Sequence, residues 1–154
     1  VRDQLVEEVD GIAERASRLL RDQLEACGFD GEALARRAVE ICVDRKATDI
    51  ILFDVRGESL MTDFCLVCSG NSEPQIRAIA GHLEETLGEA GVRPAHVDGV
   101  ASSRWMVIDY GTLLVHVFHP ELRRYYQLEK LLGEERILVS EAMTPKPEVD
   151  PVTG

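Results

Sequence analysis

The sequence predicts an α/β fold in which a mixed sheet of four to five strands is flanked by helices. In four segments, apolar residues recur at the spacing of an amphipathic helix, and short continuous apolar runs lie between those segments. Helical and strand-like segments also alternate along the chain. This order favours an α/β sheet that is partly parallel, because a helix between two strands can serve as a crossover connection.

The first two helices are expected near the N-terminus. Apolar residues recur among charges from Leu5 to Cys27, and Gly28 follows as a helix stop, so residues 1–28 are expected to form an extra amphipathic helix. Asp30 then stands where an N-cap belongs, and the second helix is expected to end near Lys46.

The next two elements are expected to be strands. Ile50–Phe53 and Phe64–Cys68 are continuous apolar runs separated by the Arg56-Gly57 turn, as in strands buried on both faces. Ser72 and Gln75 then have the spacing of a capping box, so a third helix is expected.

The third helix is expected to end at Gly91, and a short extended piece should follow around Ala95–Val97. Two further strands, Trp105–Tyr110 and Leu113–Phe118, are expected to form a tight hairpin joined at Gly111 and Thr112. The apolar spacing after Pro120 predicts one last helix, which Gly133 should end.

The chain therefore divides into three parts. Residues 1–28 form the N-terminal helix, residues 29–140 form the α/β domain, and residues 141–154 contain too few apolar side chains to pack. The last part is expected to be a disordered tail.

Charge and composition bear on partners and location. The chain has 154 residues, a net charge of −11 and a pI near 4.8, which opposes binding that depends mainly on phosphate contacts, such as binding to DNA. No apolar run reaches the length of a membrane span, so a cytoplasmic protein without a membrane partner is expected. A basic protein partner suits this charge, although the acidity could equally serve solubility alone.

A Cys-x-x-Cys spacing occurs at Cys65 and Cys68, and this pattern can bind zinc or carry redox chemistry. Here it lies in an expected strand, where residues three apart point to opposite faces of the sheet. The two sulfurs are therefore expected to be core groups and no metal site is expected.

The Ser69–Ser72 loop joins a strand to a helix N-terminus, where backbone amides can bind an anion. A nucleotide-transfer enzyme would also need a pair of carboxylates for magnesium, and the expected strands near this loop offer only Asp109. The loop is therefore interpreted as a capped helix start, and the chain is not expected to be an enzyme.

Strand alternation places Trp105 and Asp109 on one face of the sheet and Tyr110 on the other. Trp and Tyr beside polar groups are typical anchors of protein interfaces, although Trp105 could equally be a core residue. His116, alone on its strand, is interpreted as structural or partner-contacting rather than catalytic.

Taken together, these segments resemble the ribosomal silencing factors of the RsfS/Iojap family. The resemblance covers roughly residues 33–132 in one order. The matching motifs are Asp49–Arg56, Met61–Ser72, Gln75–Ala80, Trp105–Gly111, Val115–Phe118 and Arg124–Glu129.

The resemblance implies an α/β fold related to nucleotidyltransferases, but without an established enzyme activity or a cofactor. It also implies a translation repressor that binds ribosomal protein uL14 on the large ribosomal subunit and blocks association with the small subunit.

Matching this sequence to the family motifs residue by residue gives six partner-binding candidates: Trp105, Asp109, Tyr110, Asp63, Phe64 and His116. Trp105 and Tyr110 are expected to act as anchors, Asp63 and Asp109 as acceptors for basic groups, and His116 as an orienting group.

Two alternatives remain open at this stage. A nucleotidyltransferase-like enzyme would bind a nucleotide at the Ser69–Ser72 loop. Alternatively, the N-terminal helix could make the chain a homodimer, or it could simply cover the sheet.

Overall fold

A computed structural model of the chain describes residues 30–58 and 62–140. The described helices are α2 (Gly31–Asp44), α3 (Glu73–Glu89), α4 (Pro120–Tyr126) and α5 (Leu128–Leu132). The strands are β1 (Thr48–Asp54), β2 (Phe64–Ser69), β3 (His96–Asp98), β4 (Trp105–Asp109), β5 (Leu113–Phe118) and β6 (Ile137–Ser140). Two short 3₁₀ helices, η1 (Ala101–Ser103) and η2 (Glu134–Arg136), complete the order.

The six strands form one mixed sheet in the order β3-β4-β5-β2-β1-β6. The β2 and β5 strands lie in the middle and run parallel, and the other neighbouring pairs are antiparallel. Between the two parallel strands the chain runs through α3, then β3, η1 and β4, so α3 is the crossover helix that the sequence predicts.

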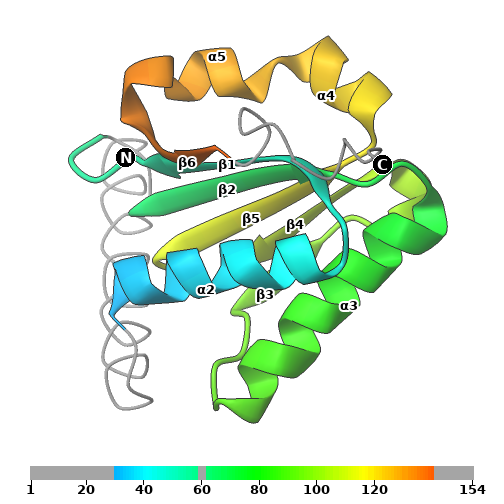
Figure 1. Ribbon diagram of the computed structural model, residues 1–154, viewed down its shortest axis with the longest axis horizontal. Helices are drawn as coiled ribbons and strands as arrows, with labels where there is room; N and C mark the ends of the chain where they lie inside the picture. The colour runs from blue at the N-terminus through cyan, green and yellow to red at the C-terminus, as the bar shows by residue number, and fades with distance from the viewer. Residues whose placement is uncertain (1–29, 59–61, 141–154) are drawn as a thin grey trace, which may run out of the picture.

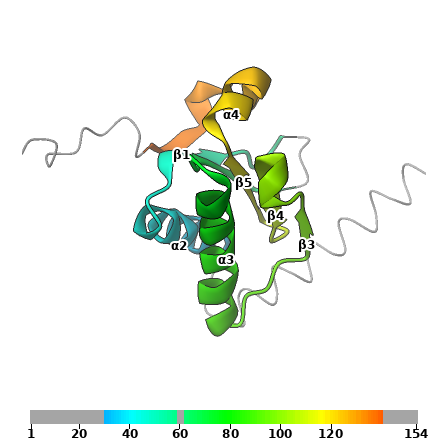
Figure 2. The same cartoon turned by 90° about the vertical axis from the view of Figure 1, so that its right-hand side faces the viewer.

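Helices cover the two faces of the sheet unequally. Figures 1 and 2 show α2 and α3 together on one face, and α4 with α5 on the other. Helices α2 and α3 have 14 and 17 residues and pack against β1, β2, β4 and β5. Because α4 and α5 have only seven and five residues, their face receives less cover.

The larger core lies under α2 and α3. Strand residues such as Leu66 and Val115 are completely buried there against helix residues such as Ile41 and Leu83. The smaller core, under α4 and α5, is built around Phe53, Val67, Phe118 and other buried or partly buried side chains. All six residues of β2 are buried, as predicted for a strand covered on both faces.

Side-chain caps begin α2 and α3, as the sequence predicts. The carboxylate of Asp30 accepts a hydrogen bond from the Ala33 amide at 2.7 Å. The Ser72 hydroxyl accepts one from the Gln75 amide at 3.2 Å. Each cap satisfies a backbone N–H that the first helical turn leaves without a partner.

The sheet has six strands, whereas the sequence predicts four to five. The additional strand, β6, pairs antiparallel with β1 at the edge of the sheet. Its four residues are too short a run to distinguish a strand from a loop by periodicity, and its pairing depends on a distant segment.

The single helix predicted after Pro120 is in fact two helices, α4 and α5, because Gln127 adopts a left-handed conformation with φ of 50°. The break lets Arg123 and Glu129 form an ion pair at 3.1 Å. In a straight helix, residues six apart would lie about 9 Å apart along the axis and about 120° apart around it.

The N-terminal helix expected at residues 1–28 and the tail expected at 141–154 lie outside the described residues. Within the described part of the chain, no helix has the length and apolar content needed to cross a membrane.

We expect Leu66→Ala to lower the free energy of unfolding by about 2–5 kcal/mol, because Leu66 is completely buried in the central strand. Urea denaturation followed by circular dichroism measures this change. Val100→Ala, at a side chain that is 59% exposed, is the control and should change stability by less than about 0.5 kcal/mol. Equal effects of the two substitutions would contradict the position assigned to Leu66.

Candidate partner-binding site

Strands β4 and β5 present a partly open face on the same side of the sheet as α4 and α5. Strand register pairs Trp105 with Phe118, Val107 with His116, and Asp109 with Leu114. Directly paired residues in neighbouring strands point to the same face of a sheet. Of these six side chains, only Phe118 is fully buried, so the other five remain partly accessible. The prediction that Trp105 and Asp109 share a face is confirmed.

Trp105 is the centre of an aromatic group on this face. Its ring stacks on Phe118 with centroids 4.7 Å apart, and lies against Tyr126 of α4 at 4.9 Å. Its indole N–H donates a hydrogen bond to Nδ1 of His116 at 3.2 Å. Trp105 therefore packs on the smaller core and also keeps a partly accessible surface.

Burial lowers the pKa of His116 to about 4, so its imidazole is neutral at pH 7. The indole of Trp105 can only donate, so Nδ1 of His116 must be the acceptor and the ring proton is on Nε2. Since a protonated ring could no longer accept this bond, the neutral state holds Trp105 in its orientation.

Both candidate carboxylates bond to the β4–β5 turn, at the far end of β4 from Trp105. Asp109 accepts a hydrogen bond from the Gly111 amide at 2.7 Å. Asp63 accepts one from the Thr112 hydroxyl at 3.1 Å, and its own amide bonds the Thr112 carbonyl. Two acidic residues that are 46 positions apart in the sequence thus bond to the same turn.

Phe64 and Tyr110 are core residues, each only 1% exposed. Both belong to the larger core under α2 and α3, on the opposite face from Trp105. Burial also raises the pKa of Tyr110, and the charge of Glu84 adds to this effect. A side chain buried to this extent has no surface to offer a partner. This corrects the expectation that Tyr110 anchors a partner and that Phe64 contacts one.

Backbone amides of the Ser69–Ser72 loop donate hydrogen bonds within the protein. The Gly70 amide donates to the Phe118 carbonyl at 2.8 Å, and the Asn71 amide donates to the side chain of Gln75 at 2.7 Å. These two amides are therefore not available to a phosphate. The geometry supports the interpretation of the loop as a capped helix start.

Cys65 and Cys68 lie in the two different cores, on opposite faces of the sheet. This placement confirms the parity argument against a shared metal site. Burial raises the pKa of Cys65 to about 12, so its thiol is protonated at neutral pH. Among the described residues, no three His, Cys, Asp or Glu side chains are grouped so as to hold a metal ion.

The family model described as "Ribosomal silencing factor during starvation" matches residues 30–152. The chain belongs to this family. A ribosomal silencing factor from Halalkalibacterium halodurans is 42% identical over 106 residues, which are 69% of this chain and 91% of that protein. The factor from Bacillus subtilis is 39% identical over 103 residues, 67% of this chain and 87% of that protein.

The chain is also similar to the chloroplastic Iojap protein of Zea mays, with 32% identity over 112 residues, 73% of this chain and 46% of that protein. Among solved structures, a Chromobacterium violaceum protein is 30% identical with a TM-score of 0.66, covering 78% of this chain and 99% of that one. A Bacillus halodurans structure is 44% identical with a TM-score of 0.54, covering 64% and 89%. Both support the α/β fold of the silencing factor family.

Sequence reasoning missed the contribution of Tyr126 to this site. Tyr126 lies against Trp105 although 21 positions separate them in the sequence. The apolar spacing after Pro120 identified Tyr126 as a helix residue but could not indicate which strand that helix would cross.

Stability should decrease as pH falls from about 6.5 to about 4, because the unfolded chain then binds a proton at His116 that the folded chain does not. Over the same pH range, the unfolding free energy of the His116→Gln variant should decrease less than that of the wild-type protein. Urea denaturation at several pH values measures the difference. An NMR titration in which the His116 ring of the folded protein protonates near pH 6.5 would contradict this assignment.

Proposed function

We propose that this chain is a non-catalytic ribosomal silencing factor that binds ribosomal protein uL14 on the large ribosomal subunit. In doing so it would keep the small subunit from joining and so repress translation. The observation that carries this proposal is membership of the silencing factor family together with a half-open aromatic and acidic sheet face.

The accessible part of Trp105 is the anchor of the proposed interface. Tryptophan contributes large contact area, and interface hot spots are enriched in this residue. Contacts with Phe118, Tyr126 and His116 already fix the ring, so little side-chain entropy remains to be lost on binding.

Asp63 and Asp109 are the proposed acceptors for basic groups of the partner. Each uses one carboxylate oxygen in the bond that holds the turn, Oδ2 in Asp63 and Oδ1 in Asp109. A carboxylate can accept several hydrogen bonds at once, and those from Arg or Lys are the strong ones.

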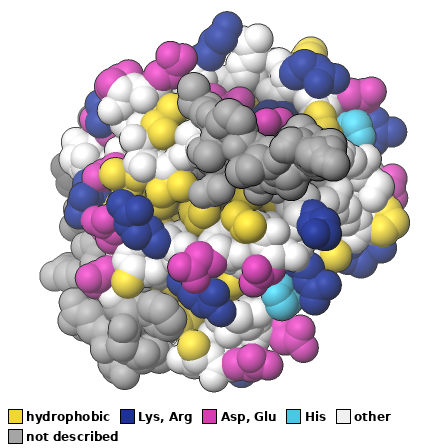
Figure 3. Space-filling model, viewed as in Figure 1, with side chains coloured by type: hydrophobic (Ala, Val, Ile, Leu, Met, Phe, Trp, Pro, Cys, Tyr) yellow, Lys and Arg dark blue, Asp and Glu magenta, His cyan; other side chains and the backbone are white. Residues whose placement is uncertain are grey.

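The net charge of −11 suits a basic partner and opposes direct binding to ribosomal RNA. Figure 3 shows Lys and Arg side chains interspersed with Asp and Glu over the face that it views. The charge therefore acts as a long-range field that speeds encounter, while the sheet face supplies the specific contacts.

Steric exclusion needs no catalytic group. The structure agrees with this, because Asp109 and the Ser69–Ser72 loop lie too far apart to form one catalytic site. Asp109 pairs with Leu114 at one end of β5, whereas Ser69 pairs with Phe118 at the other end. Four residues along a strand span about 13 Å, so Asp109 is far from the loop that a nucleotide-transfer enzyme would use.

The proposed site of action is the cytoplasm, where ribosomal subunits meet. No membrane or DNA partner is required. A homodimer formed through residues 1–28 stays a prediction, since that segment lies outside the described residues.

Sedimentation of mixed ribosomal subunits in a sucrose gradient tests the function. The full chain should migrate with the large subunit and reduce the peak of joined ribosomes. Migration with the small subunit, or an unchanged joined peak at saturating protein, would contradict the proposal.

We expect Trp105→Ala to weaken binding to purified uL14 by more than about 1 kcal/mol, the level that separates hot spots from neutral contacts. Calorimetry measures the affinity, and circular dichroism verifies that the variant folds. Trp105→Phe keeps an aromatic ring but loses the N–H, so it should fold more stably than Trp105→Ala.

Leu131→Ala is the matched control, because Leu131 is 80% exposed and belongs to α5 rather than to β4 or β5. It should leave the affinity within about 0.5 kcal/mol of the wild-type value. A folded Trp105→Ala protein that binds uL14 normally would show that the anchor lies elsewhere.

A further inference from the structure

A pocket of about 480 Å³ lies between β1 and the α4–α5 pair, where β2 ends. This volume is typical of small-molecule sites. The pocket lies by the carboxyl end of a parallel strand, the position that ligands favour in α/β sheets. Charged and hydroxyl side chains in its lining are Asp49, Ser69, Arg123, Arg124, Glu129 and Lys130.

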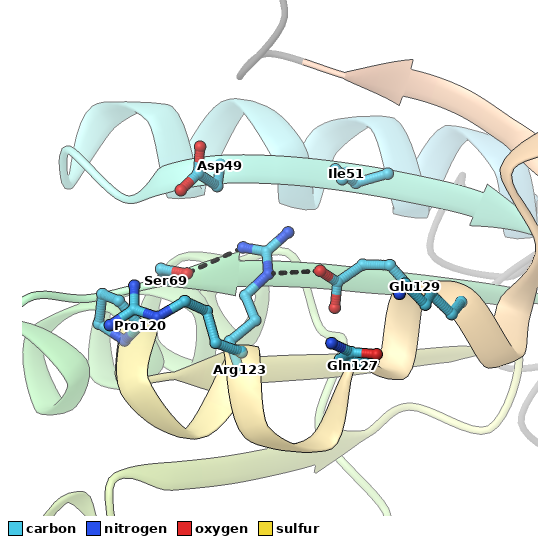
Figure 4. Close-up of a pocket in the computed structure, with 9 residues that line it drawn as sticks. Asp49, Ile51, Ser69, Pro120, Arg123, Gln127 and Glu129 are labelled. Carbon is cyan, nitrogen blue, oxygen red and sulfur yellow. Dashed lines mark hydrogen bonds and ion pairs between the residues drawn. The ribbon is translucent and has the colours of Figure 1, made fainter.

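Arg123 is the fixed cation of this pocket and is only 7% exposed. Its Nη1 donates to the Ser69 hydroxyl at 2.8 Å, and its Nε donates to Glu129 at 3.1 Å. A guanidinium has five N–H donors, and these two bonds use only two of them. Figure 4 shows the remaining end of the group pointing toward the strand that carries Asp49 and Ile51.

Arg124 and Lys130 line the same pocket and are exposed. With Arg123 they supply three positive charges against the two carboxylates of Asp49 and Glu129. In a chain with a net charge of −11, this local excess of positive charge is opposite to the overall field. Arg and Lys together are the usual ligands of phosphate groups.

The two carboxylates of the pocket can accept hydrogen bonds from a ligand. Oε2 of Glu129 is buried and has no hydrogen-bond partner among the described residues, a state that costs free energy. Asp49 offers a second carboxylate on the opposite wall. Sugar hydroxyls donate to carboxylates in this way, as the ribose does in dinucleotide-binding sites.

We propose that this pocket binds a small phosphorylated sugar, such as the ribose 5-phosphate part of a nucleotide. The phosphate lies against Arg123, Arg124 and Lys130, and the sugar hydroxyls donate to Glu129 and Asp49. Phosphate alone leaves the carboxylates without donors, and the negative field of the chain repels a polynucleotide. The site is a binding site only, and it does not depend on the proposed uL14 interaction.

An NMR titration of the ¹⁵N-labelled full chain tests this proposal with four probes: ribose 5-phosphate, inorganic phosphate, ribose and a uridine tetranucleotide. Ribose 5-phosphate should shift the amide signals of Ser69, Gln127 and Lys130 and saturate them. Its Kd should be at least about tenfold lower than the Kd of phosphate or ribose, since it makes both sets of contacts.

Three single substitutions in the pocket and one control on α3 separate the two sets of contacts. Arg124→Ala and Lys130→Ala should each raise the Kd of ribose 5-phosphate by about tenfold. Arg77→Ala on α3 removes the same charge from the other side of the sheet and should have little effect. Asp49→Asn should weaken the binding of ribose 5-phosphate but not of inorganic phosphate, because it replaces one acceptor oxygen with an NH2 donor and removes the negative charge.

Asparagine suits this position, since Asp49 has a φ of 51° and asparagine tolerates the left-handed region. Several outcomes would overturn the proposal. They are the absence of saturable shifts at about 10 mM ribose 5-phosphate, equal affinity for inorganic phosphate, an equal loss in Arg77→Ala, or tighter binding of the tetranucleotide.

Discussion

The parallel pairing of β2 with β5 buries the middle of the sheet on both faces, and most other features of the fold follow from it. A parallel pair needs a crossover, which α3 provides, and both faces need cover because the central strand is apolar on each side. On one face α2 and α3 give that cover. On the other face the short helices α4 and α5 cover only part of the sheet.

Unequal cover explains where the proposed interface lies. Trp105 packs on Phe118 and Tyr126 at the border of the covered area, and its N–H is bonded to a neutral His116. Beyond that border, β4 and β5 present side chains that are neither core nor fully exposed. A surface of this kind is rigid before binding, which reduces the entropy lost when a partner docks.

Helix α4 connects this face to the pocket on its other side. Tyr126 contacts Trp105, while Arg123, less than one helical turn away, bonds Ser69 of β2 and Glu129 of α5. The bond to Glu129 requires the break at Gln127, since a continuous helix would hold the two side chains apart. The feature that the helical pattern failed to predict is therefore the one that builds the pocket.

The sequence by itself determined the α/β class, two helix caps, the hairpin at Gly111, and the faces on which Trp105 and Cys65 lie, because these follow from local periodicity and local hydrogen bonds. Its motifs also identified the family. Only the tertiary structure decided that Tyr110 is buried, that β6 joins the edge, and that Asp63 and Asp109 both bond to one turn. Those outcomes depend on pairing and packing between segments far apart in the chain, which no local pattern encodes.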